Sequence, residues 1–124
     1  MKTVLLVEDD PINAQVLTHL LRAHGYRPVV AYNGIEGLAT FERERPAMAI
    51  VDIQLPRKNG FEVCFDMKRT EHGRSMPVLL MSAVYTDTDH ARRYSAELKA
   101  DGYLKKPFDM SALVTRVREL IGQA

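Results

Sequence analysis

The sequence predicts an α/β protein in which helices cover both faces of a parallel sheet. Five short apolar runs recur along the chain, and apolar residues at helical spacing follow each of them. Three of the runs are nearly continuous rather than alternating, which is typical of strands buried on both faces. Strands that alternate with helices of about ten to fifteen residues imply right-handed crossovers and therefore a parallel sheet.

The five apolar runs are the predicted strands. All of them are rich in Val, Ile, Leu and Tyr, and the first, third and fourth are the nearly continuous ones. They cover residues 3–7, 28–32, 48–51, 78–81 and 102–104.

The predicted helices are recognised by apolar residues that share one face. The first helix is expected to end before Gly25, and the last to begin near Asp109 or Ser111, which are capping candidates. The apolar stripes, in chain order, are Ile12, Val16, Leu20 and Leu21; Ile35, Leu38 and Phe41; Phe61, Cys64 and Phe65; Ala91, Tyr94, Ser95 and Leu98; and Met110, Leu113, Val114, Val117, Leu120 and Ile121.

Length and charge narrow the class of protein. A chain of 124 residues fits one domain, expected to span 1–124, because two halves would be too small to bury separate cores. The net charge of +1 gives no reason to expect nucleic acid or an anionic membrane as a partner. The single cysteine excludes an internal disulfide framework, and no apolar run approaches the roughly 20 residues that span a bilayer. We therefore expect a cytoplasmic protein without membrane insertion.

Polar residues that interrupt the apolar pattern gather at the ends of the predicted strands. Glu8 and Asp9 follow the first strand, and Asp52 follows the third. Ser82 follows the fourth strand and Lys106 follows the fifth. In an open parallel sheet, ligand sites form at this edge, where the carboxyl ends of the strands meet. The sequence therefore predicts one site made of these side chains.

The residue types at this edge suit phosphoryl transfer. Two or three carboxylates in one crevice repel each other, and a hard divalent cation such as Mg²⁺ relieves the repulsion. A further carboxylate can attack phosphorus while a metal, a hydroxyl and an ammonium take up charge on the phosphoryl oxygens. Asp52, Ser82 and Lys106 are the candidates for these roles.

Each residue also has an ordinary explanation. The three acids after the first strand could complement the helix that follows, and Asp10 before Pro11 is expected to be its N-cap. Asp52, Ser82 and Lys106 could be a turn residue, a strand-end hydroxyl and a solvated lysine. Their joint occurrence, one at each of several strand ends, is what favours a site.

Four segments carry a resemblance to a known family. They read Val-Glu-Asp-Asp-Pro at 7–11, Val-Asp-Ile-Gln-Leu-Pro at 51–56 with Gly60 following, Met-Ser-Ala at 81–83 and Tyr-Leu-Lys-Lys-Pro-Phe at 103–108. The chain resembles the receiver domain of bacterial response regulators, in its single-domain, chemotaxis-regulator-like form. The resemblance implies a flavodoxin-like (βα)5 three-layer sandwich, with a five-stranded parallel sheet of order 2-1-3-4-5.

The same resemblance implies a role for each site residue. Asp52 would be the phosphoacceptor. Asp9 would bind Mg²⁺ directly, Glu8 mainly through water, and Asp52 and the backbone carbonyl of Gln54 would complete the protein's ligands.

Three more residues receive switching or charge-pairing roles from the resemblance. Ser82 would donate to the phosphoryl group, and Lys106 would pair with the phosphate or with Asp52. Tyr103 would be the aromatic switch whose ring moves inward when Ser82 moves.

The function implied is that of a two-component signalling switch. A histidine kinase or histidine phosphotransfer protein would phosphorylate Asp52 in the presence of Mg²⁺. The face formed by the segments near 91–98, 102–104 and 110–121 would then change for an unknown output protein or domain. The chain would be a monomer or a phosphorylation-linked dimer. It would not be an enzyme in the usual sense, because it modifies only itself.

Two alternatives remain open on the sequence alone. The chain could be a pseudo-receiver, which keeps the fold and binds a protein partner without phosphorylation. It could also be a flavodoxin-type cofactor-binding protein or an aspartyl phosphatase, although acids stand where a flavodoxin has its phosphate loop. Among the departures from the receiver pattern are Ser82 in place of the commoner threonine and Lys99 in place of the usual glycine.

Overall fold

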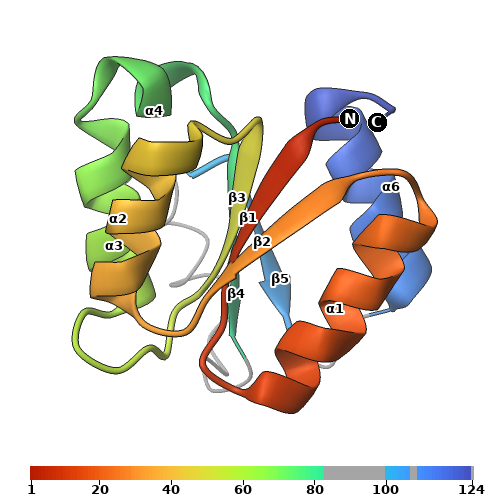
Figure 1. Cartoon of the computed structure of the whole chain (residues 1–124), viewed down its shortest axis with the longest axis horizontal. Coiled ribbons are helices and arrows are strands. Elements are labelled where there is room, and N and C mark those ends of the chain that lie inside the picture. Colours follow the sequence, from red (N-terminus) through yellow and green to blue (C-terminus); the bar gives the residue numbers. More distant parts are fainter. Residues whose placement is uncertain (83–99, 107–108, 124) are drawn as a thin grey trace.

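Five parallel strands form a single sheet of order β2-β1-β3-β4-β5 in the computed structural model (Figure 1). The structure describes residues 1–82, 100–106 and 109–123. The predicted strand order is confirmed, and each predicted strand is found within one residue of its expected bounds. The strands are β1 Thr3–Val7, β2 Arg27–Ala31, β3 Met48–Asp52, β4 Val78–Ser82 and β5 Gly102–Lys105.

The described helices lie on both faces of the sheet (Figure 1). One face carries α1 (Pro11–Ala23) and α6 (Met110–Ile121). The other carries α2 (Gly34–Glu44), α3 (Gly60–Lys68) and the short helix α4 (Glu71–Ser75). The helix predicted near 91–98 lies outside the described residues. Within the described part of the chain, no helix has the length and apolar character needed to cross a membrane.

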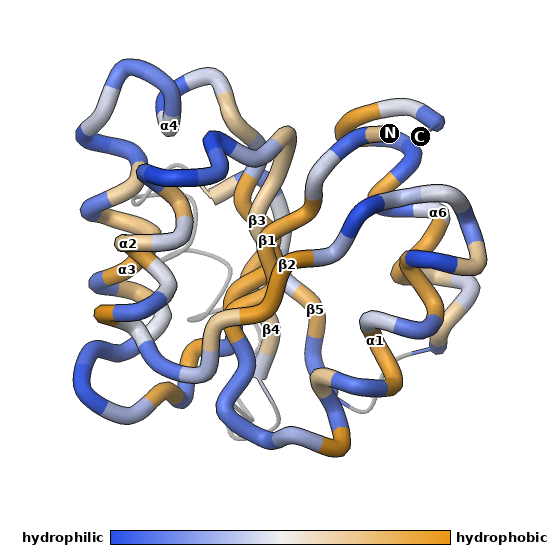
Figure 2. The backbone as a smooth tube through the Cα atoms, in the orientation of Figure 1, coloured by the Kyte–Doolittle hydropathy of each residue, from blue (hydrophilic) through white to orange (hydrophobic). Residues whose placement is uncertain are grey.

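The hydrophobic core consists of two layers, one on each side of the sheet. In β1, Leu5 and Val7 belong to the layer under α2 and α3, and Val4 and Leu6 to the layer under α1 and α6. This alternation explains why β1, β3 and β4 are apolar along most of their length, since both faces of each strand are covered. Figure 2 shows the hydrophobic colouring concentrated on these central strands.

The buried face of α1 differs from the stripe predicted from its sequence. Ile12 and Val16 are 71% and 44% exposed. The helix packs on the sheet through a neighbouring face, on which the small side chain of Ala14 allows close approach to the strands; the buried residues are Ala14, Leu17 and Leu21. Other apolar residues on predicted stripes that are substantially exposed are Ile35, Phe65 and Met110.

Helix ends follow the predicted capping signals. The Asp10 side chain accepts from the Ile12 N–H at the start of α1, and Gly25 after its end has φ 86°. Asp109 caps α6 by accepting from the Ser111 N–H. The five-residue α4 was not predicted, because a helix this short presents no apolar repeat; it begins at the N-cap Thr70.

Candidate functional site

The carboxyl ends of four neighbouring strands bring the predicted site residues together. Glu8 follows β1, Asp52 ends β3 and Lys106 follows β5. The Lys106 ammonium donates to Asp52 Oδ2 and to Glu8 Oε1, each at 2.7 Å. Ser82 ends β4, and its backbone carbonyl accepts from the Lys106 N–H at 2.9 Å. The structure thus joins residues that lie up to 98 positions apart in the chain.

The position of Glu8 is fixed by the sheet. Its N–H donates to the carbonyl of Ala31 at 3.0 Å, which extends the pairing of β1 with β2 by one residue. As a result the Glu8 side chain is only 1% exposed. Asp9, the next residue, is exposed. One carboxylate of the acidic pair is therefore held in the protein and the other faces solvent.

Asp52 is held by two hydrogen bonds on different oxygens. Oδ1 accepts from the Gln54 N–H at 2.9 Å, and Oδ2 accepts from Lys106. The start of α3 passes very close to this residue, because a Cβ at Gly60 would lie 2.2 Å from the Asp52 carbonyl oxygen. Glycine at position 60 is therefore required for this approach. The role of the Gln54 carbonyl as a metal ligand stays a prediction.

Burial and charge shift the pKa of two groups at the site. Burial raises the pKa of Glu8 from 4.5 to about 7, and the hydrogen bond from Lys106 only partly opposes this rise. Burial alone would lower the pKa of Lys106, but its hydrogen bonds to Asp52 and Glu8 outweigh burial and raise it. A single ammonium thus contacts two buried carboxylates, and Asp9 adds a third negative group beside them.

The carboxylates fit a hard divalent cation. Glu8, Asp9 and Asp52 each offer an oxygen, and these oxygens lie within 4.8 Å of one another. Mg²⁺ prefers such oxygen ligands and usually keeps several waters, for which the exposed side of Asp9 leaves access. The three acidic side chains thus form a cluster that could hold a divalent cation, and the binding of Mg²⁺ there stays a prediction.

The two predicted switch residues lie on β4 and β5. Ser82 is fully buried at the end of β4. Tyr103 pairs with Leu80 in the sheet register and packs against the core layer under α2 and α3. Tyr103 lies on β5, three residues before Lys106, which directly follows the strand.

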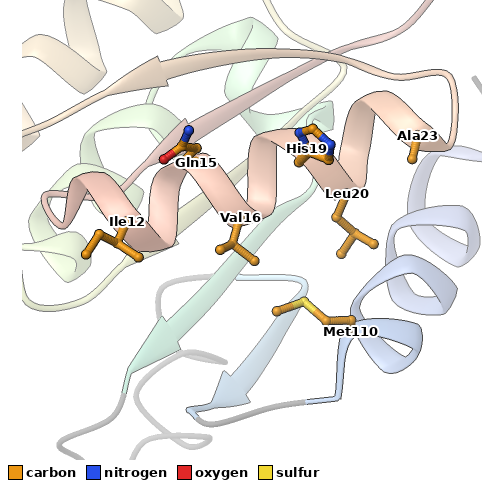
Figure 3. A pocket seen from close by; sticks show the side chains of 7 residues that line it. All are labelled: Ile12, Gln15, Val16, His19, Leu20, Ala23 and Met110. Atoms are coloured by element: carbon orange, nitrogen blue, oxygen red, sulfur yellow. The ribbon is translucent and has the colours of Figure 1, made fainter.

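An apolar groove next to the site was not predicted as a surface. Figure 3 shows Ile12, Val16 and Leu20 pointing to one side of α1, toward Met110 at the start of α6. The groove has a volume of about 530 Å³ and is also lined by Gln15, His19 and Ala23. Because α1 and α6 begin just after Asp10 and Asp109, one end of the groove lies at the edge that carries Asp52. No local signal in the sequence marks this orientation of α1, because its apolar residues fit two overlapping helix faces.

Comparison with known proteins agrees with this geometry. The family model for the response regulator receiver domain matches residues 4–118. The DNA-binding dual master transcriptional regulator RpaA of Synechocystis sp. is 33% identical over 98% of this chain and 49% of its own length. The chain therefore spans about half the length of the curated relatives it matches.

Solved structures show the same fold. The receiver domain of the sensor histidine kinase PA1611 from Pseudomonas aeruginosa, which has a magnesium ion in its active-site cleft, is 30% identical with a TM-score of 0.87, and 98% of each chain is covered. A putative response regulator from Chloroflexus aurantiacus gives a TM-score of 0.90 at 30% identity, again with 98% of each chain covered. With these matches and the strand-end cluster of Glu8, Asp9, Asp52 and Lys106, the chain belongs to the response regulator receiver domain family of two-component signalling systems.

Proposed function

We propose that this chain accepts a phosphoryl group on Asp52 in the presence of Mg²⁺ and thereby acts as a two-component signalling switch. The observation that carries the proposal is the pairing of Asp52 with Lys106 at 2.7 Å, beside two further carboxylates within 4.8 Å. This arrangement supports the proposal because it would supply a nucleophile, a positive charge and ligands for a cation at one point of the sheet.

The chemistry follows from the roles of the side chains. An Asp52 carboxylate oxygen attacks the phosphorus of a phosphohistidine, the P–N bond breaks, and the imidazole nitrogen leaves with the bonding electron pair. Lys106 is positioned to pair with a phosphoryl oxygen after transfer. Glu8, Asp9 and Asp52 would hold Mg²⁺, with the Gln54 carbonyl as a further ligand, and the ion would supply positive charge for the phosphoryl oxygens.

The switch follows from the charge that is added. A phosphoryl group brings close to two negative charges and three acceptor oxygens to Asp52. The Ser82 hydroxyl, at the end of the next strand, is the proposed donor to one of these oxygens. Movement of Ser82 toward the group would let the Tyr103 ring move inward and alter the surface around β5 and α6. The helix predicted near 91–98 would complete this surface.

The phosphoryl donor is proposed to be a histidine kinase or histidine phosphotransfer protein. The apolar groove of α1 and Met110 supports a contact surface for it, since the groove begins at the edge that carries Asp52. The output is proposed to pass to a partner protein or a further domain, from a monomer or a phosphorylation-linked dimer in the cytoplasm. The chain would modify and dephosphorylate only itself and turn over no separate substrate.

The direct test uses acetyl phosphate as a small donor. Incubation with Mg²⁺ should add the mass of one phosphoryl group, and chelation of Mg²⁺ should prevent the addition. Asp52→Asn should abolish the addition. The control is Asp66→Asn, which removes from α3 a carboxylate that pairs with Lys58 at 2.5 Å, and this variant should still be phosphorylated. If wild type and Asp52→Asn both keep an unchanged mass, the chain is instead a phosphorylation-independent interaction module.

A further inference from the structure

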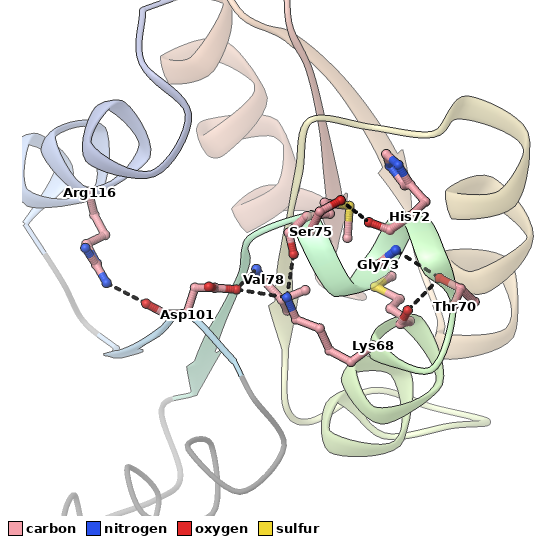
Figure 4. A network of polar contacts seen from close by, with 10 residues as sticks. Lys68, Thr70, His72, Gly73, Ser75, Val78, Asp101 and Arg116 are labelled. Carbon is pink, nitrogen blue, oxygen red and sulfur yellow. Dashed lines mark hydrogen bonds and ion pairs between the residues drawn. The ribbon is translucent and has the colours of Figure 1, made fainter.

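A second lysine–carboxylate pair lies at the opposite edge of the sheet, where β4 and β5 begin. Asp101 Oδ2 accepts from the Lys68 ammonium at 3.1 Å and from the Val78 N–H at 2.8 Å. The Lys68 side chain is only 9% exposed, and its ammonium also donates to the Met76 carbonyl at 2.5 Å. Figure 4 shows Asp101 linked to Lys68 and Val78 on one side, with Arg116 of α6 donating to its backbone carbonyl on the other.

Asp101 and Val78 exchange two hydrogen bonds, which hold the start of β5 in one register against β4. The Asp101 N–H donates to the Val78 carbonyl at 2.8 Å, while the Val78 N–H donates to the Asp101 side chain. The neighbours Ala100 and Gly102 have no side-chain acceptor. A shift of β5 by one residue would therefore leave the Val78 N–H without this partner.

Burial fixes the register of β5 less firmly than that of the central strands. Among the strands that the structure describes, β5 pairs with β4 alone; it has four residues and is partly exposed along most of its length. Its large apolar side chains are Tyr103 and Leu104, whereas β4 is buried throughout. The pattern of burial specifies register strongly only where a face is fully covered. Polar groups at the start of β5 are thus needed to fix it.

The register decides where Lys106 lies. Lys106 follows Asp101 by five residues, which is about 16 Å along a strand. A shift of two residues would keep the same side chains on the same faces but move Lys106 by about 7 Å. Its ammonium now contacts Asp52 and Glu8 at 2.7 Å, so such a shift would break both contacts.

We propose that Lys68 and Asp101 are positioning residues that set the register of β5 and so place Lys106 at the phosphoryl site. Lys68 holds the Asp101 carboxylate toward Val78, and Asp101 holds the start of the strand. The inference deepens the proposed function and rests on it for the role of Lys106. The register itself is independent of that function.

The test combines three measurements on Asp101→Ala, Asp101→Asn and Lys68→Met. They are the rate of Asp52 phosphorylation by acetyl phosphate at saturating Mg²⁺, the Mg²⁺ affinity by calorimetry, and the hydrogen exchange of the Lys106 amide, which donates to Ser82. Thr70→Ala is the matched control, because it removes the N-cap of α4 in the same region without touching β5. Each protein is measured at a temperature at which circular dichroism shows it folded.

Asp101→Ala should slow phosphorylation about tenfold, since small misplacements of a catalytic group are costly. It should also speed exchange of the Lys106 amide. The Mg²⁺ affinity should not fall, because Glu8, Asp9 and Asp52 keep their places on β1 and β3, and a displaced Lys106 ammonium competes less with the cation for their charge. Asp101→Asn, which keeps an acceptor for Val78, and Lys68→Met should fall between Asp101→Ala and wild type, and Thr70→Ala should match wild type.

The outcomes separate this inference from the proposed function. If wild type accepts a phosphoryl group and Asp101→Ala does so at the same rate, Lys68 and Asp101 only stabilise the fold. A parallel loss of Mg²⁺ affinity would likewise indicate general damage and overturn the inference. If wild type accepts no phosphoryl group, the proposed function fails. Amide exchange still tests the role of Asp101 in the register of β5, and an unchanged exchange rate of the Lys106 amide in Asp101→Ala would overturn that role.

Discussion

Two lysines lie at opposite edges of the same sheet, and each donates to a carboxylate. They differ in how many carboxylates each ammonium contacts. Lys68 contacts one carboxylate, Asp101, and a backbone carbonyl. Lys106 contacts two carboxylates, Glu8 and Asp52, whose side chains are 1% and 8% exposed. The Lys68–Asp101 pair has no net charge, and its carboxylate also accepts from a backbone N–H. The cluster of Lys106, Glu8 and Asp52 has one more carboxylate than ammonium groups, and the exposed Asp9 adds a further negative charge.

The difference shows how an ion pair that only holds other groups in place can be told from one at a candidate reacting site. A buried charge is tolerated when it is paired and hydrogen-bonded, and the Lys68–Asp101 pair meets that condition within the protein. The Lys106 cluster meets it only when a cation is bound or a carboxylate takes up a proton. Burial raises the pKa of Glu8 to about 7, and the neighbouring Asp52 carboxylate adds to the rise that Lys106 opposes.

The largest effect is expected from Lys106→Met. Loss of a preorganised positive group from a reacting site typically costs about a hundredfold or more in rate, and acetyl phosphate labelling of Asp52 should slow by that order. Time-resolved intact mass measures it. Lys105→Met, a change at the exposed neighbour, should label like wild type. Equal rates for the two variants would remove the distinction between Lys106 and an ordinary surface lysine.

Lys68→Met should act mainly on stability. The change leaves the Met76 carbonyl and the Asp101 carboxylate without their ammonium partner. The free energy of unfolding should fall by about 2 kcal/mol, the usual cost of leaving such groups unpaired. Urea denaturation followed by circular dichroism measures this change. An unchanged denaturation midpoint would show that the pair contributes nothing to the fold.

Asp9→Asn should weaken Mg²⁺ binding about tenfold, an order typical of damage to a metal site. The physical reason is the loss of one negative oxygen ligand, while the fold is kept because Asp9 is exposed. Calorimetric titration with Mg²⁺ measures the affinity. Asp10→Asn is the control, since asparagine also serves as an N-cap and Asp10 is the cap of α1. A similar loss in both variants would argue against a specific ligand role for Asp9.

The smallest effect is a slope of stability with pH in the absence of Mg²⁺. Because the pKa of Glu8 is raised from 4.5 to about 7, the folded protein keeps a proton that the unfolded chain has lost between these values. The free energy of unfolding should therefore fall as the pH rises through this window and level off above it. Urea denaturation at several pH values measures the slope. Glu8→Gln should flatten it, and Glu119→Gln, at an exposed position, should not.

The grouping of polar side chains at one edge of the sheet was predictable from the sequence, because it follows from chain order and sheet geometry alone. Acids, a hydroxyl and a lysine placed after successive parallel strands meet at one edge whatever the details of packing. The resemblance to receiver domains added the strand order and the roles of individual residues. The structure confirms the order and brings Glu8, Asp9, Asp52 and Lys106 together.

Features that depend on packing were not predictable. The apolar residues of α1 fit two overlapping helix faces, and only contact with the sheet decides that Ala14 is buried while Ile12 is exposed. The contact of Lys68, at the end of α3, with Asp101, just before β5, joins residues 33 positions apart, for which no local pattern exists. The role of Asp101 at the start of β5 became visible only with the register of that strand.

The contrast between the two edges is tested most directly by a Mg²⁺ titration of the ¹⁵N-labelled protein, followed by amide chemical shifts. The account predicts saturable shifts for the amides of Glu8, Asp9 and Gln54, at the edge that carries Asp52. The amides of Val78 and Asp101, at the edge with the neutral pair, should stay unchanged. Shifts of equal size at both edges, or none at either, would contradict the conclusion that unbalanced negative charge marks the functional site.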